Sequence, residues 1–195
     1  MHPAPIFSWD DRSGMFAFVA ERSFATFAGT VDKKLLIAHA PVLVEPERDR
    51  LLLHFSRGNP LGRAMPVRVV AVVAGPDAYV SPDWYTEPDQ VPTWNYVAVE
   101  LEGVLEPTAP ATLREIVDRL SAEHERRIPG KAPWTSAKMT PSVLAAKLAG
   151  IVGATLSIED VRGTRKLSQN KSADDRSSVI AALGANPLAA LMKPD

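Results

Sequence analysis

Strand-like segments follow one another through the first two-thirds of the chain, and the connections between them are too short to hold helices. Phe24–Val31 and Lys34–Val44 flank a turn at Asp32, so we expect them to form a hairpin. Leu51–Ser56 and Val67–Ala74 are further apolar runs, and the second is dense in valine, which favours a buried strand. A doubly wound parallel sheet needs a helix between successive strands. This order of elements therefore favours a β-barrel.

The later part of the chain adds one more clear strand and the helices. In Trp94–Leu105, apolar and polar residues alternate from Val97 onward, which indicates a half-buried strand. Apolar residues at helical spacing then predict helices, and a second alternating segment predicts a late strand. The sequence thus predicts a mainly β fold with α: a barrel with peripheral helices, forming one domain over residues 1–195 with a C-terminal helix at about 172–195. These later elements are expected at Ala111–Arg127, Pro141–Val152, Thr155–Val161 and Ser172–Leu183.

Composition removes several classes of function. The 22 basic and 23 acidic residues give a formal charge of -1, which excludes a strongly basic nucleic-acid coat protein. The absence of cysteine excludes disulfide frameworks, zinc ribbons, thiolate nucleophiles and cysteine-ligated iron–sulfur clusters. No segment reaches the about 18 consecutive apolar residues of a membrane helix, and the N-terminal segment lacks a basic signal-peptide start. We therefore expect a cytoplasmic protein with no membrane partner.

The familiar catalytic signatures are missing from the sequence. It contains no GxGxxG, GxxxxGK[ST], HExxH or GxSxG motif. The four histidines are not spaced as metal ligands, and the Glu123-His124-Glu125 run is more typical of a solvated helix face. We therefore expect no metal site, and no residue can be assigned as catalytic.

The segment from His54 to Pro76 contains arginines at 57, 63 and 68 and no acidic residue. A strand ending at Ser56-Arg57 before Gly58 places a hydroxyl, a guanidinium and backbone N–H groups together, which are the donors that a phosphate needs. The residues alone support a phosphate site and a plain exposed turn equally.

Two further segments contain unusual groups of residues. Gly75–Tyr85 and the stretch beginning at Val91 are rich in aromatic residues and proline, which suits a wall for a planar ligand, a subunit interface or a loop pinned to the barrel. Arg165–Lys171 combines cations with amide and hydroxyl side chains just before a predicted helix. That pattern is more typical of a polar turn than of a ligand site.

Taken in order, these segments resemble the PaiB family of FMN-binding split-barrel proteins. The most specific matches are GPDAYVSPDWY (Gly75–Tyr85), VPTWNYVAV (Val91–Val99) and KLSQNKSADDR (Lys166–Arg176), and the resemblance extends from roughly Phe7 to Leu183. It implies a six-stranded split β-barrel, a homodimer with FMN at the subunit interface, and a role in negative control of transcription. The chain departs from the family pattern at Asp77, where a histidine is common, and at Ser56-Arg57-Gly58, where Ala-Arg-Ala is usual.

The resemblance also implies which residues contact the cofactor. The Ser-Arg pair that holds the FMN phosphate in related flavoproteins corresponds to Ser56 and Arg57, with Asn59 nearby. By their position in the matching segments, the remaining residues divide between the isoalloxazine ring and the partner subunit. Thr93, Trp94 and Asn95 border the ring, Lys166 and Gln169 reach the cofactor from the partner, and His39 belongs to the looser match at Ala38–Pro41.

Alternatives to an FMN-binding regulator remain open at this point. One is a flavin-dependent oxidoreductase that uses a nicotinamide or deazaflavin electron donor, because flavin carries the redox chemistry itself. Another is a haem-binding barrel with His39 or His54 as axial ligand. Direct DNA binding is possible but has no support in the sequence, which shows no helix-turn-helix and no recognition helix.

Overall fold

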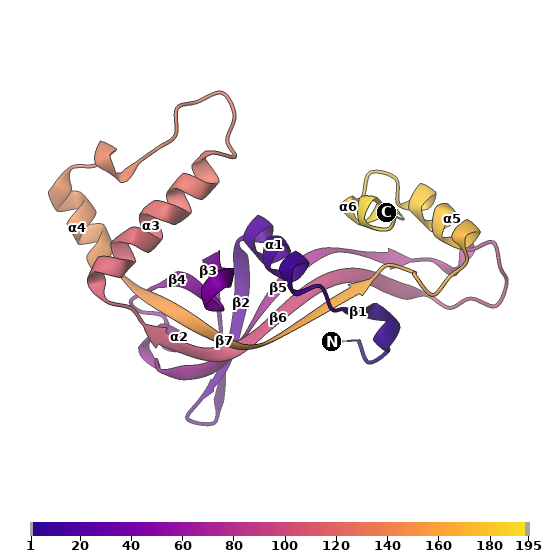
Figure 1. Cartoon of the computed structure of the whole chain (residues 1–195), viewed down its shortest axis with the longest axis horizontal. Helices are drawn as coiled ribbons and strands as arrows, with labels where there is room; N and C mark the ends of the chain where they lie inside the picture. Colours follow the sequence, from indigo (N-terminus) through magenta and orange to yellow (C-terminus); the bar gives the residue numbers. More distant parts are fainter. Residues whose placement is uncertain (1, 194–195) are drawn as a thin grey trace. The chain divides into compact units, whose positions relative to one another are not determined.

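The structure is a computed structural model that describes residues 2–193, and its main feature is a sheet that closes on itself (Figure 1). The strands follow the order β1-β7-β4-β3-β2-β5-β6, and β6 also pairs with β7. Six strands therefore form a ring, and the short β1 is paired to β7 beside it. This confirms the predicted six-stranded barrel. The strands are β1 (Ser8–Trp9), β2 (Phe24–Val31), β3 (Lys34–Glu45), β4 (Arg50–Ser56), β5 (Val67–Val80), β6 (Thr93–Pro107) and β7 (Ile151–Lys166).

The helices are short and lie between or after the strands. The predicted helices at Ala111–Arg127 and Ser172–Leu183 are confirmed as α3 and α5, and the Ser172 hydroxyl caps α5 by accepting from the backbone N–H of Asp175. The helices are α1 (Arg12–Arg22), α2 (Pro60–Arg63), α3 (Pro110–Glu125), α4 (Pro141–Ala149), α5 (Ala173–Leu183) and α6 (Pro187–Leu191), with 3₁₀ turns at Pro5–Phe7, Pro46–Arg48, Pro82–Trp84 and Ser136–Lys138.

Four elements differ from the sequence-based expectation. β5 continues to Val80, so the expectation that Gly75–Tyr85 is all loop is wrong for its first part, although glycine and proline at 75 and 76 usually interrupt strands. The helix expected to reach Val152 ends at Ala149, because β7 begins at Ile151. The same strand extends well beyond the predicted Thr155–Val161. The tail of the predicted C-terminal helix is the separate helix α6, and residues 194–195 lie outside the described part.

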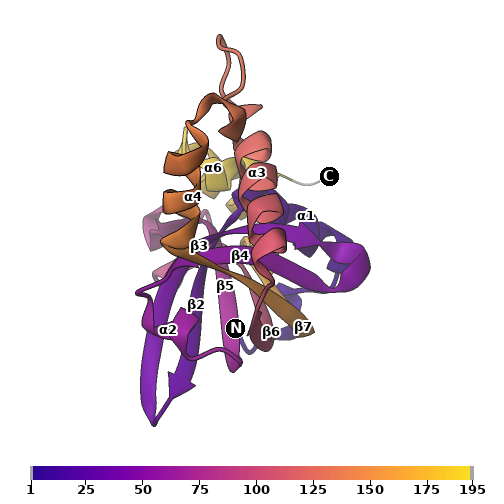
Figure 2. The same cartoon turned by 90° about the vertical axis from the view of Figure 1, so that its left-hand side faces the viewer.

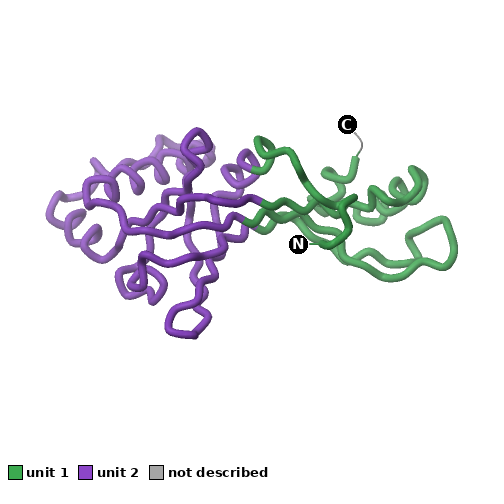
Figure 3. Tube along the Cα trace, turned by 60° about the horizontal axis from the view of Figure 1, so that its bottom comes forward, with its two compact units in different colours: residues 1–15, 74–100, 162–195 green, residues 16–73, 101–161 purple. Residues whose placement is uncertain are grey.

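The chain forms two compact units, coloured separately in Figure 3. Unit 1 comprises residues 1–15, 74–100 and 162–195, and unit 2 comprises residues 16–73 and 101–161. Strands β5, β6 and β7 contribute residues to both units, whereas β2, β3 and β4 belong to unit 2 alone.

In unit 2, the β2–β3 hairpin shows why the sequence folds as it does. Asp32 and Lys33 both have positive φ (47° and 63°), which is the geometry of a tight hairpin turn that matches strand twist. Alternate residues face the barrel interior, where the rings of Phe27 and Phe55 pack edge to face with centroids 5.7 Å apart. The buried residues on the inner faces of β2, β3, β4 and β5 include Ala25, Phe27, Ala38, Ala40, Leu51, Leu53, Phe55, Val69, Ala71 and Val73.

Helix α3 covers the outer face of β3 and β4, and Figure 2 shows it beside α4. Its buried Ile116 and Leu120 pack with Leu52 of β4. Arg119 also donates to Glu45 of β3 at 2.5 Å. By contrast, α4 has no buried residue and contains mostly apolar side chains. Within residues 2–193, none of the helices has both the length and the apolar character that crossing a membrane requires.

Candidate functional site

The predicted phosphate-binding residues form one turn in unit 2, between the end of β4 and the start of α2. The Arg57 guanidinium donates from Nε to the Ala149 carbonyl (2.6 Å) and from Nη2 to the Ile151 carbonyl (3.0 Å). The Arg57 backbone N–H also donates to the Gly150 carbonyl at 2.9 Å. The turn is therefore fastened to the segment that joins α4 to β7.

Asn59 shapes the same turn from its other end. Its Oδ1 accepts from the backbone N–H groups of Leu61 (2.9 Å) and Gly62 (3.3 Å), which is the N-cap of α2. Arg63 lies one helical turn further on, and its Nε donates to the Arg57 carbonyl at 3.3 Å. Asn59 thus stabilises the backbone conformation of this turn, in which Arg57 and Arg63 lie close together.

The donor set of this turn fits a phosphate. A guanidinium has five N–H donors, and the two bonds from Arg57 to carbonyl oxygens use two of them. The Ser56 and Arg57 side chains are exposed, and the stretch from His54 to Pro76 has no acidic residue. The turn can therefore present a hydroxyl and an oriented guanidinium to an anion.

A second group of predicted residues meets in unit 1, in a pocket of about 170 Å³. Thr93, Asn95 and Lys166 all line it, although Thr93 and Lys166 are 73 positions apart in the sequence. The Lys166 ammonium donates to the Thr93 hydroxyl at 2.6 Å and lies 5.6 Å from the centre of the Phe7 ring. Because ligand pockets usually measure about 300–1,000 Å³, this pocket can enclose only part of a cofactor.

Sequence reasoning missed Lys171, which brings a second ammonium group to this pocket. It donates to Gln90 Oε1 at 2.6 Å and lies 5.1 Å from the centre of the Tyr85 ring. Lys171 belongs to the KLSQNKSADDR match and Tyr85 to the GPDAYVSPDWY match. The sequence signal that could have identified Lys171 is its place in a segment that matches the family. Its contacts with the other segment join residues far apart in the chain, so no local pattern reveals them.

The turn after β7 places Ser168 beside Asn95. Ser168 is buried and has a φ of 58°, a left-handed conformation that is uncommon for residues other than glycine. Gln169 holds the turn, because its Oε1 accepts from the Leu167 N–H (2.7 Å) and its Nε2 donates to the carbonyls of Arg165 (2.5 Å) and Ile6 (3.0 Å). Gln169, which was predicted to contact the cofactor, therefore orders the turn that links Lys166 to Lys171.

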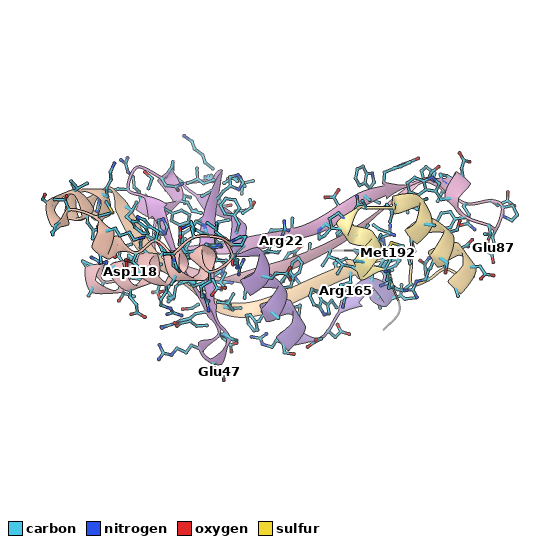
Figure 4. The ribbon with its side chains drawn as sticks, turned by 90° about the horizontal axis from the view of Figure 1, so that it is seen from above. Arg22, Glu47, Glu87, Asp118, Arg165 and Met192 are labelled. Atoms are coloured by element: carbon cyan, nitrogen blue, oxygen red, sulfur yellow. The ribbon has the colours of Figure 1, made fainter. Side chains whose placement is uncertain are left out.

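Asn95 lies at the bottom of this arrangement and is 0 % exposed. Its Nδ2 donates to the Ser168 hydroxyl at 2.8 Å and lies 3.8 Å from the Met192 sulfur. Its Oδ1 is buried without a hydrogen-bond partner among the described residues. Arg165 on β7 and Met192 after α6 are labelled in Figure 4 and mark this part of unit 1.

The structure does not bring the other predicted residues to either group. Trp94 is 56 % exposed on the opposite face of β6 from Thr93 and Asn95, and its ring packs edge to face with Tyr79 at 6.2 Å. His39 is exposed on β3 in unit 2, where its Nδ1 lies 3.0 Å from the Thr26 hydroxyl and its ring stacks on Phe24.

His54, the second candidate haem ligand, lies on β4. Its Nδ1 is buried without a partner among the described residues, and burial lowers the pKa of its imidazole. The side chain is therefore neutral in the fold at physiological pH. Within residues 2–193, no group of three or more His, Cys, Asp or Glu side chains is placed to hold a metal ion.

Unit 2 also contains a larger pocket of about 450 Å³, which is lined by none of the predicted site residues. Its arginines already have partners: Arg119 pairs with Glu45, Arg126 with Glu123, and Arg127 with Glu123 and the Glu21 carbonyl. We therefore take two separate candidate sites, one in each unit: the Ser56–Arg57 turn of unit 2 and the lysine pocket of unit 1.

The chain is similar in sequence and in structure to several known proteins. A family model described as "Putative FMN-binding domain" matches residues 1–160. The "Protease synthase and sporulation protein PAI 2" of Bacillus subtilis is 34% identical over 170 residues, which cover 85% of this chain and 81% of that protein. Among solved structures, the FAD and heme binding protein of Mycobacterium smegmatis aligns with a TM-score of 0.58 at 21% identity, covering 91% of this chain and 80% of that chain. The flavocytochrome Anf3 of Azotobacter vinelandii aligns with a TM-score of 0.62 at 17% identity, covering 91% of this chain and 78% of that chain. These two structures share the fold.

Proposed function

Since the chain belongs to the family of FMN-binding domains, FMN is its cofactor, and we propose that it is a dimeric FMN-binding regulatory protein of the PaiB type. The observation that carries this proposal is the lysine pocket of unit 1. There, Thr93, Asn95 and Lys166 come together from segments far apart in the chain, and these are residues that the family resemblance assigns to the flavin. FMN supplies one- and two-electron redox chemistry when it is bound.

We propose that the Ser56–Arg57 turn holds the phosphate end of the cofactor. The carbonyl bonds to Ala149 and Ile151 fix the orientation of the Arg57 guanidinium, so little side-chain freedom is lost on binding. Ser56 adds a hydroxyl, while Asn59 keeps the turn in shape through its N-cap bonds. Arg63 adds a second positive charge near the same turn.

The ring end is assigned to the unit 1 pocket, with Thr93 and Asn95 along one side, whereas Trp94 lies on the opposite face of β6 and stays outside this pocket. Lys166 and Gln169 belong to the same chain as Thr93 and Asn95 in this pocket, Lys166 as the contacting cation and Gln169 as the residue that orders its turn. A buried carbonyl oxygen such as Asn95 Oδ1 accepts a hydrogen bond from an imide N–H, and an ammonium donates to ring carbonyl oxygens. The side chains present therefore fit the polar edge of a flavin.

An exposed apolar face on β2 and β3 supports the proposed homodimer. The register pairs Phe24 with Pro41, Thr26 with His39 and Ala28 with Ile37, so these residues share the outer face of the hairpin. Phe24, Ile37 and Leu35 are 57 %, 53 % and 68 % exposed. Contiguous exposed apolar residues mark interaction surfaces. His39 lies on this face and would reach the cofactor at the interface between two copies.

Replacing Ile37 with glutamate places a charge in the proposed interface. We expect Ile37→Glu to convert the dimer into a monomer in sedimentation analysis and to weaken FMN binding, because a buried unpaired carboxylate is strongly unfavourable. Val143→Glu, at a residue of α4 that is 47 % exposed, is the matched control and should leave the dimer intact. A dimeric Ile37→Glu protein would exclude this face as the interface.

Removing the Arg57 guanidinium tests the phosphate assignment. Loss of a charge-assisted hydrogen bond costs about 1.5–3 kcal/mol, so Arg57→Ala should weaken FMN binding tenfold or more in a fluorescence titration. Riboflavin lacks the phosphate, and its affinity should change much less. Arg48→Ala, at an arginine whose side chain is 67% exposed, serves as the control. Unchanged FMN affinity in a folded Arg57→Ala protein would remove this residue from the site.

The regulatory part of the proposal rests on the similarity to the PAI 2 protein of B. subtilis. We do not assign a DNA contact, because the sequence shows no helix-turn-helix and no recognition helix. Regulation through a protein partner or through cofactor state therefore fits the chain better than direct repression. A cytoplasmic location stays a prediction.

A further inference from the structure

The unit 1 pocket is positively charged beyond what a neutral ring edge requires. Lys166 and Lys171 both line it, and the described residues that line it include no aspartate or glutamate. Each ammonium group has three N–H donors, and the hydrogen bonds to Thr93 and Gln90 use one in each case. Several donors on two fixed cations therefore remain for an anion.

The orientation of the Asn95 amide adds a second requirement that a ligand of this pocket must meet. A thioether sulfur accepts hydrogen bonds but has no proton to donate, so the group nearest Met192 Sδ is the amide nitrogen. Nδ2 also bonds to Ser168 Oγ, which leaves Oδ1 as the atom without a partner. Because Asn95 is fully buried and lines the pocket, this acceptor needs a donor from the ligand.

We propose that this pocket is a binding site for an oxyanion that still carries a proton, such as a hydrogen phosphate group. The oxyanion oxygens would accept from Lys166, Lys171 and the Ser168 hydroxyl, whose own O–H is not used in accepting from Asn95. The ligand P–O–H would donate to Asn95 Oδ1. Sulfate has the same shape but no proton at neutral pH, so it would leave this buried acceptor unpaired.

This site shares Lys166, Thr93 and Asn95 with the proposed flavin site, and it adds Lys171, Ser168 and a stated ligand chemistry. The anion has two possible sources: a separate anionic ligand, or the phosphate of FMN, in which case the Ser56–Arg57 turn does not hold that phosphate. Both present the same group to the pocket. The experiment below distinguishes them and also separates this inference from the proposed function.

The test is isothermal titration of the full-length flavin-free protein with orthophosphate and with sulfate near neutral pH. We expect saturable orthophosphate binding and about tenfold weaker sulfate binding, which corresponds to about 1.4 kcal/mol for one buried acceptor left unpaired. Lys166→Met and Lys171→Met should each weaken orthophosphate binding about tenfold. Lys193→Met, at an exposed lysine of the same unit, should leave it unchanged.

Repeating the orthophosphate titration on the FMN-loaded protein identifies the source. Binding that persists points to a separate anionic ligand. Binding that is lost points to the FMN phosphate if Lys166→Met weakens FMN but not riboflavin, and to a separate anion that competes with the flavin ring if it weakens both. Absence of orthophosphate binding, equal affinity for sulfate, or equal affinity in the lysine variants would overturn the proposal even if FMN binds. Orthophosphate binding in a protein that takes up no FMN would instead overturn the flavin function alone.

Discussion

We expect Gly103→Ala to lower the melting temperature of the protein by about 6–12 °C, because it introduces a clash where the barrel closes. Gly103 is buried in β6, and a Cβ atom at this position would overlap the carbonyl oxygen of Ser157 in β7. Both groups belong to paired backbones, so neither can move aside as a side chain could. We expect a cost of about 3 kcal/mol, at the upper end for overpacking, which corresponds to that shift in a chain of this size.

Gly58→Ala is the matched control for this experiment. Gly58 has no neighbouring atom within 4 Å of the position of an added Cβ, and its φ is not in the left-handed region. Alanine there should leave the melting temperature unchanged or raise it slightly. A Gly103→Ala protein that melts within about 2 °C of the wild type would have lost less than about 1 kcal/mol of stability. That result would show that the backbones of β6 and β7 do not approach as closely at Gly103 as the structure has them.

Asp175→Ala releases the loop before β6 from helix α5, and we expect a clear drop in melting temperature and rapid proteolysis within residues 85–92. Asp175 is 0 % exposed, and its Oδ1 accepts from the Thr86 N–H (2.7 Å), the Thr86 hydroxyl (2.7 Å) and the Glu87 N–H (3.3 Å). Alanine leaves these donors without their acceptor. The loop carries Tyr85, which lines the lysine pocket, so orthophosphate affinity should fall as well.

The charge of Asp175 also makes this contribution dependent on pH. The hydrogen bond from the Thr86 side chain is the largest cause that lowers the pKa of Asp175 in the fold. The unfolded chain then binds the proton more readily, so the carboxylate stabilises the fold above about pH 4 and this stabilisation is lost as the pH falls through the folded pKa. The stability difference between wild type and Asp175→Asn should shrink over that range.

The neighbouring Asp174 provides the control, because it is exposed in the same first turn of α5. Asp174→Ala should change the melting temperature and the proteolysis rate much less than Asp175→Ala. Equal effects of the two substitutions would mean that the hydrogen bonds from Thr86 and Glu87 do not hold the loop.

Local patterns were sufficient to predict the strands of unit 2. The β2–β3 hairpin was found because period-two burial and a turn at Asp32 are properties of neighbouring residues. β5 was predicted too short because Gly75-Pro76 is locally a strand breaker, while the strand is continued by its pairing within the sheet. Helix α1 was missed because Ser13 and Gly14 leave too short an apolar run to suggest it.

The candidate site was predictable only through family resemblance. Nothing local joins Thr93 and Asn95 to Lys166, because their contact arises in unit 1 where β6 begins and β7 ends. The roles of Ser168 and Gln169 depend on a left-handed backbone and on three bonds to distant backbone groups, which no spacing rule reveals. The single domain over residues 1–195, the oxidoreductase alternative and the haem alternative stay predictions.

The visible absorption spectrum of the purified protein, recorded before and after FMN is added and the excess removed, tests the central claim most directly. We predict a retained flavin spectrum, shifted from that of free FMN, with one FMN per chain. Failure to retain any flavin would contradict the account. A sharp Soret band on addition of haemin to such a flavin-free protein would then favour the haem-binding barrel instead.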